Sequence, residues 1–251
     1  MLSKRSYSLV SAGIRLALAA ACLTGTTGII RADIIPVQNA GFETLPITGL
    51  PLTAGCPAAD CSYDSGVTPP DWTFINSGGG TVGQFQPGAV PSTLYESYPA
   101  GDGPTFGYVG GNGELYQTVS TTIVAGLTYT LTVDVGTAKP PIIFNSPFVE
   151  LWAGNTTTGS LLVSDNPSPT AGDWETVTLT YVSLLNDPNA GQQLTIVLGG
   201  SIDNGLTRAD FDNVRLSDNA ITATPEPSSL WILLTGVALL LVFRRRAATL
   251  G

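Results

Sequence analysis

Residues 127–135 read LTYTLTVDV, and the fold is decided by this stretch. Apolar residues occupy every second position, and threonine or aspartate occupies the positions between them. Successive side chains of a β-strand point to opposite faces of its sheet, so this alternation predicts a strand with one buried and one solvated face. The predicted buried face carries Leu127, Tyr129, Leu131, Val133 and Val135.

The same alternation recurs outward from this stretch along the chain. The clearest further strands are 147–154 (PFVELWAG), 174–182 (WETVTLTYV), 192–200 (QQLTIVLGG) and 210–217 (DFDNVRLS). Shorter candidates are 37–43 (VQNAGFE), 71–76 (DWTFIN), 81–85 (TVGQF), 105–110 (TFGYVG) and 114–120 (ELYQTVS). Helical periodicity is almost absent, and Gly, Pro, Asn and Asp separate the segments. The sequence therefore predicts an all-β protein, a two-sheet antiparallel jelly-roll sandwich.

The N-terminus has the pattern of an export signal. Lys4, Arg5 and Arg15 supply positive charge, 16–23 is apolar, and a cleavage site lies before Asp33. We therefore expect a signal peptide over 1–32, a sandwich domain over 33–220 and an exported protein. A lipoprotein signal with Cys22 as the lipidated residue is the alternative.

The C-terminus reads as a linker over 221–227 with Pro225, Glu226 and Pro227, then a short transmembrane helix over 228–246. The uncharged run 230–243 is shorter than the ~20 residues that span a bilayer comfortably. Three basic residues end it, and such a cluster keeps its end of a helix in the cytoplasm. They are Arg244, Arg245 and Arg246.

The order of these three parts resembles the PEP-CTERM sorting signal of exported Gram-negative bacterial proteins. The resemblance implies an exosortase-type membrane protease as partner, with Pro225, Glu226 and Pro227 as its recognition residues. It implies a precursor anchored in the inner membrane and a mature protein at the cell surface or in the extracellular matrix.

Charge is distributed unevenly along the chain. All of the 19 acidic residues except Glu226 lie within 33–224, where the basic residues are Lys139, Arg208 and Arg215. A domain with so large a negative charge repels nucleic acid, and nucleic-acid binding is excluded.

Cysteine usage agrees with export. If Cys22 leaves with the signal peptide, Cys56 and Cys61 remain as a close pair in a loop-like segment. A disulfide between Cys56 and Cys61 is the prediction, and a metal site is the alternative. The absence of histidine leaves that metal site without a usual zinc shell.

Several short motifs resemble those of carbohydrate-binding modules and galactose-binding-like jelly rolls. They are 39–43 (NAGFE), 71–72 (DW), 172–174 (GDW) and 211–216 (FDNVRL). The resemblance implies a structural calcium held by Glu43 and Asp212, with backbone carbonyls near Asn39 and Gly41. The alternative is that both carboxylates are ordinary residues at strand ends.

Glycan recognition needs aromatic faces beside polar groups. The loop around residue 95 offers both, and its candidate ligand-binding residues are Tyr95, Glu96, Tyr98 and Asp102. The alternative is that these aromatic residues cover one end of the sandwich.

Catalysis has little support in the sequence. There is no histidine and no Gly-x-Ser-x-Gly motif, and any carboxylate pair, such as Glu96 with Glu114 or Glu150, carries little signal in so acidic a domain. The sequence thus predicts a non-catalytic surface or matrix protein that binds a glycan, such as an exopolysaccharide. The alternatives are a purely structural or adhesive component and a glycoside hydrolase.

Overall fold

The fold is built around the strand that the sequence singles out. In the computed structural model this strand is β7 (Leu127–Gly136). The structure describes residues 32–53, 61–88, 91–92, 94–98, 103–140, 143–144, 146–156, 158–201 and 207–220. It pairs antiparallel with β11 (Trp174–Val182) on one side and with β13 (Thr207–Ala220) on the other. Four of its five predicted inward residues are fully buried: Tyr129, Leu131, Val133 and Val135.

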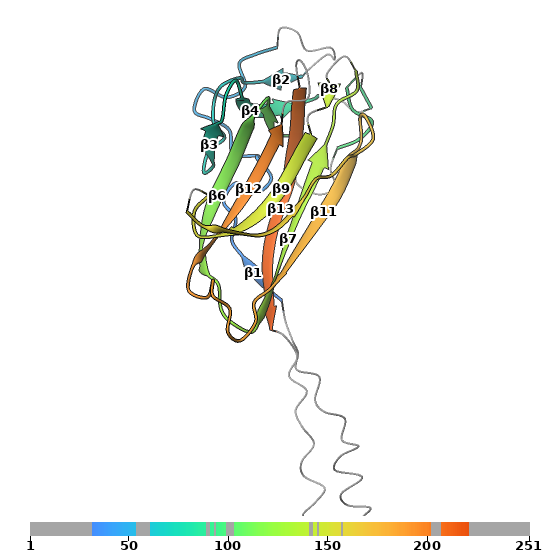
Figure 1. The fold of residues 1–251 in the computed structure, drawn as a ribbon. Helices are drawn as coiled ribbons and strands as arrows, with labels where there is room; N and C mark the ends of the chain where they lie inside the picture. Colours follow the sequence, from blue (N-terminus) through green and yellow to red (C-terminus); the bar gives the residue numbers. More distant parts are fainter. Residues whose placement is uncertain are drawn as a thin grey trace, which may run out of the picture. The chain divides into compact units, whose positions relative to one another are not determined.

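The larger sheet has eight strands in the order β11-β7-β13-β5-β4-β2, with two more strands paired to β13. Beyond β13 lie β5 (Phe106–Gly110), β4 (Thr81–Gln86) and the edge strand β2 (Ser62–Tyr63). The two additional strands are β1 (Asp33–Ile35), which is antiparallel to β13, and β8 (Ile143–Phe144), which is parallel to it. In Figure 1, β2, β4 and β8 lie at the upper end of the sandwich, where β13 begins.

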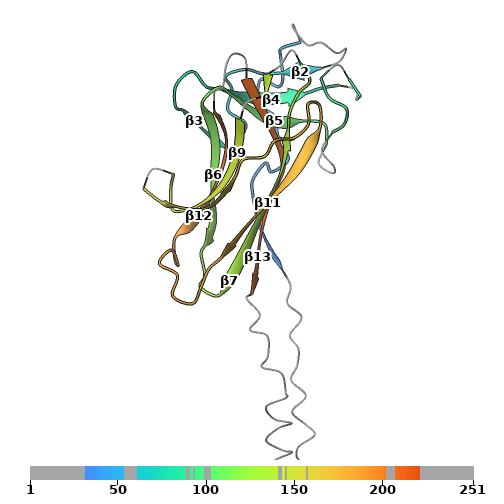
Figure 2. The same cartoon turned by 45° about the vertical axis from the view of Figure 1, so that its right-hand side comes forward.

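The smaller sheet has five antiparallel strands in the order β10-β9-β12-β6-β3. They are β10 (Ser160–Asp165), β9 (Ser146–Ala153), β12 (Gln193–Ser201), β6 (Gly113–Thr122) and β3 (Thr73–Asn76). Figure 2 shows this sheet facing the larger one. Leu115, Leu151, Ile196 and Leu198 are fully buried in the core that also contains the inward face of β7. The predicted all-β, two-sheet antiparallel jelly-roll sandwich is confirmed.

The outward face of the larger sheet is only partly solvated. Along β7, Thr128, Thr130 and Thr132 are partly exposed, whereas Asp134 is 7% exposed. A second apolar cluster covers the sheet at this end, and we call it the outer aromatic cluster. Its buried members are Cys61, Phe85, Leu94, Tyr95, Phe106, Tyr108 and Ala138, with Tyr63 and Trp174 packed against them.

One predicted strand is wrong. Residues 37–43 form turns because Asn39 and Phe42 have left-handed backbone angles, with φ values of 46° and 55°. The Asn39 side chain stabilises this course: its amide donates to Thr44 O (3.2 Å) and Pro70 O (3.0 Å), and its oxygen accepts from Thr44 N (2.9 Å). The sequence does not predict strand β10, because its segment SLLVSD has three adjacent apolar residues and no alternation.

The predicted signal peptide and C-terminal helix fall on residues 1–31 and 221–251, outside the described residues. The domain boundaries therefore stay predictions. Within the described part of the chain, no helix is long and apolar enough to cross a membrane.

Candidate functional site

The candidate site lies in the outer aromatic cluster, on one row of residues that crosses the larger sheet. Asp210 of β13 pairs with Gly136 of β7 on one side and with Tyr108 of β5 on the other. Trp174 of β11 continues the row beyond Gly136, and Gly83 of β4 continues it beyond Tyr108. Strand pairing therefore places a carboxyl group between two aromatic residues.

Gly136 allows the tryptophan to approach the carboxylate. A Cβ atom at this position would lie 2.7 Å from three atoms of the Trp174 indole, so the indole lies directly against the strand backbone. The Trp174 Nε1 donates a hydrogen bond to Ser97 O (3.2 Å), which fixes the ring against the covering loop. A side chain at residue 136 would exclude the indole from this place.

Tyr95 reaches the site from the loop over the sheet. The Ser92 hydroxyl accepts hydrogen bonds from Leu94 N (3.2 Å) and Tyr95 N (3.0 Å), and this local turn directs Tyr95 inward. Lys139 N donates to Leu94 O (2.8 Å) and ties the loop to the chain beyond β7. Tyr95 is fully buried, and its hydroxyl donates to Asp210 Oδ2 (2.7 Å).

Arg208 completes the polar centre. Its Nε lies 2.7 Å from Asp210 Oδ1, and its Nη2 donates to the Tyr95 hydroxyl. The guanidinium stacks over the Phe85 ring, 4.4 Å from the centroid, with Tyr108 at 5.0 Å and Phe106 at 5.7 Å. The aromatic faces of the cluster therefore already surround a positive charge.

The rings pack edge to face around this centre. Phe106 meets Tyr95 at 5.3 Å between centroids and Trp174 at 5.0 Å, both in T-shaped geometry. Phe85 lies 5.5 Å from Phe106. Such contacts stabilise the cluster beyond the burial of its area, and they surround Asp210 with apolar material.

Burial controls the protonation of the site. It raises the pKa of the Asp210 carboxyl, and the charge of Arg208 and the hydrogen bond from Tyr95 counteract that rise. Burial also raises the pKa of the Tyr95 phenol well above its usual range, with Arg208 opposing it. The pKa of Arg208 is raised by Asp210 against the effect of its own burial. The site therefore places a buried carboxyl group, whose pKa is raised, directly against a fixed cation.

The loop residues predicted to bind a ligand separate in the structure. Tyr95 is at the centre of the candidate site. Glu96 is exposed and forms an ion pair with Lys139 (2.5 Å), and the Tyr98 hydroxyl donates to Gly88 O. Asp102 lies outside the described residues. Of this set, the structure brings only Tyr95 to Asp210 among the residues it describes.

The two predicted calcium ligands each have a backbone partner. Glu43 Oε1 accepts from Thr105 N (2.8 Å), and Asp212 Oδ1 accepts from Asn213 N (2.7 Å). The Asn39 carbonyl accepts from both Phe42 N (3.1 Å) and Trp72 Nε1 (3.2 Å), so its lone pairs are already used. Among the described residues, no group of three or more acidic or cysteine side chains could hold a metal. The calcium site stays a prediction.

Cys61 is buried and disulfide-bonded. Cys22 and Cys56 both lie outside the described residues, so the pairing of Cys61 with Cys56 stays a prediction. The sorting residues Pro225, Glu226, Pro227, Arg244, Arg245 and Arg246 also lie outside them.

Glu114 and Glu150 lie on the smaller sheet, on strands that flank β12. Burial raises the pKa of Glu114, and the charge of Glu150 adds to this rise. Glu96 instead belongs to the loop that bonds to Gly172 beside the larger sheet. Within the described structure, Glu96 therefore does not form a carboxylate pair with Glu114 or Glu150.

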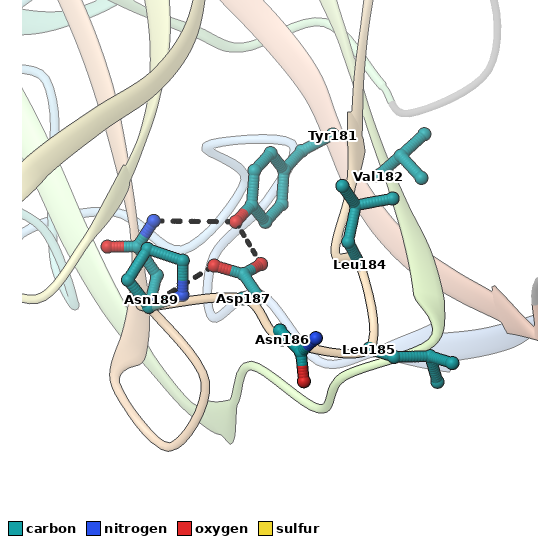
Figure 3. A pocket seen from close by; sticks show the side chains of 8 residues that line it. Tyr181, Val182, Leu184, Leu185, Asn186, Asp187 and Asn189 are labelled. Atoms are coloured by element: carbon teal, nitrogen blue, oxygen red, sulfur yellow. Dashed lines mark hydrogen bonds between the residues drawn. The ribbon is translucent and has the colours of Figure 1, made fainter.

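A hollow lies at the other end of β11, where the strand runs into the turn 183–192 (Figure 3). The Tyr181 hydroxyl donates to the Asp187 carboxylate, and Asn189 N donates to Asp187 Oδ1 (2.8 Å). Leu184 and Leu185 are largely exposed beside them. This tyrosine–aspartate pair is half-exposed and holds a turn, whereas the Tyr95–Asp210 pair is fully buried among aromatic rings.

Comparison with known proteins decides what kind of domain carries this site. A protein-family model described as "HpiC1-like: HpiC1 cyclase" matches residues 33–217. The chain belongs to the HpiC1-like cyclase family. No protein with a curated description matches the sequence significantly.

Solved structures of cyclases share the fold of this HpiC1-like chain. A Stig cyclase from Fischerella sp. TAU, in complex with (3Z)-3-(1-methyl-2-pyrrolidinylidene)-3H-indole, is 27% identical with a TM-score of 0.62, over 76% of this chain and 100% of the other. A Fischerella cyclase in its apo form is 27% identical with a TM-score of 0.63, over 76% and 98%. A cyclase from Fischerella sp. TAU in complex with 4-(1H-indol-3-yl)butan-2-one is 26% identical with a TM-score of 0.60, over 76% and 99%.

Family membership corrects the functional predictions from the sequence. A member of a cyclase family is not the predicted non-catalytic matrix protein, nor a structural component or glycoside hydrolase. The recognition of a PEP-CTERM protein with a carbohydrate-binding-like domain is wrong as a description of this protein. The predicted partners are corrected with it: the exosortase-type protease, the glycan and the inner membrane. Short motifs misled here because jelly rolls of unrelated function share them.

Sequence reasoning missed Arg208 and Asp210. A signal was available, because Arg208 is one of three basic residues in the domain and Asp210 follows it on the same face of a strand. Polar residues at these positions should face solvent unless another segment covers them. The covering loop at 91–98 could not be placed over them from the sequence.

Proposed function

We propose that this HpiC1-like protein is a cyclase that closes a ring in a small indole-type substrate by acid catalysis at Asp210. One observation carries the proposal: Asp210 is a fully buried acid among aromatic rings, with the Tyr95 hydroxyl 2.7 Å from its Oδ2. The indole compounds bound by two related cyclases support the substrate class. Aromatic residues around the acid suit a flat, aromatic substrate.

The chemistry follows from the groups present. Asp210 in its protonated form gives a proton to the substrate, which becomes cationic. The ring-closing bond forms when an electron pair of the substrate reaches the cationic atom, and a proton then returns to the Asp210 carboxylate. The product is an isomer of the substrate, so the step needs no oxidant or reductant.

Each neighbour of Asp210 has a role in this scheme. Burial raises the pKa of the carboxyl and so favours the protonated form that donates. The faces of Phe85 and Phe106 stabilise positive charge, as their contacts with the Arg208 guanidinium illustrate. The Tyr95 hydroxyl donates to Oδ2, which holds the carboxyl group in one orientation and stabilises the carboxylate once the proton has left.

Location and metal content belong to the same proposal. We propose that the domain 33–220 is exported after removal of residues 1–32. The disulfide at Cys61 supports an oxidising compartment.

We retain Glu43 and Asp212 as ligands of a structural calcium, which would take its remaining oxygens from groups other than the Asn39 carbonyl.

The test is an isomerisation assay on a panel of 3-alkenyl indoles. Mass spectrometry and NMR would detect products of unchanged mass with a new ring. Asp210→Asn should lose at least a hundredfold in kcat, because the amide cannot donate an acidic proton. Asp187→Asn is the matched control, since Asp187 also accepts from a tyrosine but lies at the other end of β11. Equal activity of Asp210→Asn and the wild type would refute the assignment of the acid.

A further inference from the structure

Asp64 departs from the ordinary hydrogen-bond pattern where β2 leaves the sheet. Its backbone N donates to Gln84 O (3.1 Å), as an antiparallel ladder requires. The return bond from Gln84 N goes to the Asp64 carboxylate, with 2.7 Å to Oδ1. The Asp64 side chain thus occupies the place that its own carbonyl oxygen would otherwise take.

The carbonyl oxygen released in this way has another partner. The Tyr108 hydroxyl donates to Asp64 O across 2.6 Å. The two groups meet over Gly83, where a Cβ atom would lie 2.4 Å from Asp64 Oδ1 and 2.7 Å from the Tyr108 hydroxyl oxygen. Gly83 therefore leaves the room in which the carboxylate and the phenol lie side by side.

Tyr108 in turn forms a wall of the candidate site. It pairs across the sheet with Asp210, and its ring lies 5.0 Å below the Arg208 guanidinium. A change in the tilt of this ring would move Arg208, which forms an ion pair with Asp210 and a hydrogen bond with Tyr95. The position of Tyr108 is thus coupled to the polar centre.

We propose that Asp64 is a positioning residue of the candidate active site: its carboxylate replaces its own carbonyl in the β2–β4 ladder and so frees that carbonyl to hold Tyr108. Asp64 is 1% exposed, and among the described residues no donor reaches its Oδ2. A buried carboxylate with an unsatisfied oxygen is costly, so its retention needs a reason beyond stability. Holding Tyr108 in place beside the Arg208–Asp210 pair supplies such a reason.

The surroundings of Asp64 contain few other titratable groups. Tyr63 precedes it, Tyr108 faces it, and Arg208 is the cation whose charge acts on Tyr108. Burial raises the pKa of Asp64 to about 6, and the hydrogen bond from Gln84 N opposes the rise. Ser65 also hydrogen-bonds to Tyr108, so this second contact needs its own control.

The test compares variants in the full-length protein by the ¹³Cζ resonance of Tyr108, assigned with Tyr108→Phe. Asp64→Ala removes the acceptor for Gln84 N, which should reclaim the carbonyl of residue 64 and release the Tyr108 hydroxyl. Its resonance should then shift or broaden. Asp64→Asn keeps an oxygen acceptor and should leave it unchanged, and Ser65→Ala should have a smaller effect than Asp64→Ala. An unshifted resonance in Asp64→Ala would overturn the proposal.

A second measurement links the contact to the site and rests on the proposed function. Affinity for 4-(1H-indol-3-yl)butan-2-one, measured by calorimetry, should fall about tenfold in both Asp64→Ala and Tyr108→Phe, with no further loss in the double variant. Asp64→Asn should retain wild-type affinity. Additive losses would overturn the coupling, whereas absence of binding by the wild type would count against the proposed function and leave the resonance test intact. If Asp64→Ala does not fold, Asp64→Ser replaces it in both measurements, with an intermediate effect expected.

Discussion

The Tyr95 hydroxyl donates a hydrogen bond to Asp210 Oδ2 across 2.7 Å, although the two residues are 115 positions apart in the chain. One residue comes from a loop over the larger sheet and the other from its central strand β13. The bond therefore joins the loop that covers the outer aromatic cluster to the sheet beneath it. It also fixes one oxygen of Asp210, a fully buried acid that lies among aromatic rings beside Arg208.

Tyr95→Phe should lower both stability and turnover. The change leaves Asp210 Oδ2 and Arg208 Nη2 without this buried partner, and loss of such a partner costs about 1–3 kcal/mol. Chemical denaturation should show this loss, with kcat reduced because the carboxyl is no longer oriented. Tyr181→Phe, at the half-exposed tyrosine–aspartate pair, is the matched control and should cost less. An equal cost in the two variants would contradict a special role for the buried pair.

Gly136→Ala tests the close approach of Trp174. The added Cβ would lie 2.7 Å from the indole, so the ring has to move away from Asp210. Overpacking of this kind costs about 1–3 kcal/mol. Trp174 fluorescence should shift as the ring leaves its place, and activity should fall. Thr132→Ala on the same strand, at a partly exposed position, should leave both measurements nearly unchanged.

The sheets could be predicted from the sequence, because alternation is a local property that each strand carries by itself. Residues 127–135 and 174–182 were placed correctly, and their predicted inward residues Leu131 and Leu179 are buried. The turn at Asn39 could not be predicted, because its positive φ is stabilised in part by a hydrogen bond to Pro70, which is 31 residues away.

The candidate site could be predicted only in part. The sequence predicts Tyr95 as a ligand-binding aromatic residue of a loop, but nothing local indicates that it turns inward to Asp210. The alternation in β7 predicts that Asp134 faces solvent, whereas it is buried and accepts hydrogen bonds from Thr176 and Asn213. Long-range cover of an outward sheet face thus hid the site from sequence reasoning. The cyclase family was hidden for a related reason, since its chemistry depends on residues brought together from separate strands and a loop.

Calcium removal tests the ligand set of Glu43 and Asp212. An ion that binds only the folded state stabilises it by about 2.7 kcal/mol at a hundredfold excess over Kd, which corresponds to several degrees in Tm. Protein supplied with calcium should therefore melt lower after EDTA treatment and recover when calcium returns. Glu43→Gln and Asp212→Asn should lose this dependence. Identical melting with and without EDTA would contradict the calcium site. The role of the two carboxylates would then be to accept the backbone hydrogen bonds from Thr105 and Asn213.

Asp64 should give the protein a distinctive dependence of stability on pH. Burial raises its pKa from 3.8 to about 6 in the folded protein, so between these values the folded state holds a proton that the unfolded state has lost. Stability from this group is complete below pH 3.8 and is lost as the pH rises through about 6. The loss by pH 7 is no more than about 3 kcal/mol.

Asp64→Asn removes this titration and keeps the acceptor for Gln84 N. The variant should therefore gain stability relative to the wild type, by up to about 3 kcal/mol in the free energy of unfolding, between pH 4 and pH 7. Urea denaturation across that range measures it. Asp187→Asn is the control. Hydrogen bonds outweigh the effect of burial at Asp187 and lower its pKa, so its variant should show no gain in stability above pH 4. A constant difference between Asp64→Asn and the wild type from pH 4 to pH 7 would mean that Asp64 titrates as an ordinary carboxyl, in conflict with its burial beside Tyr108.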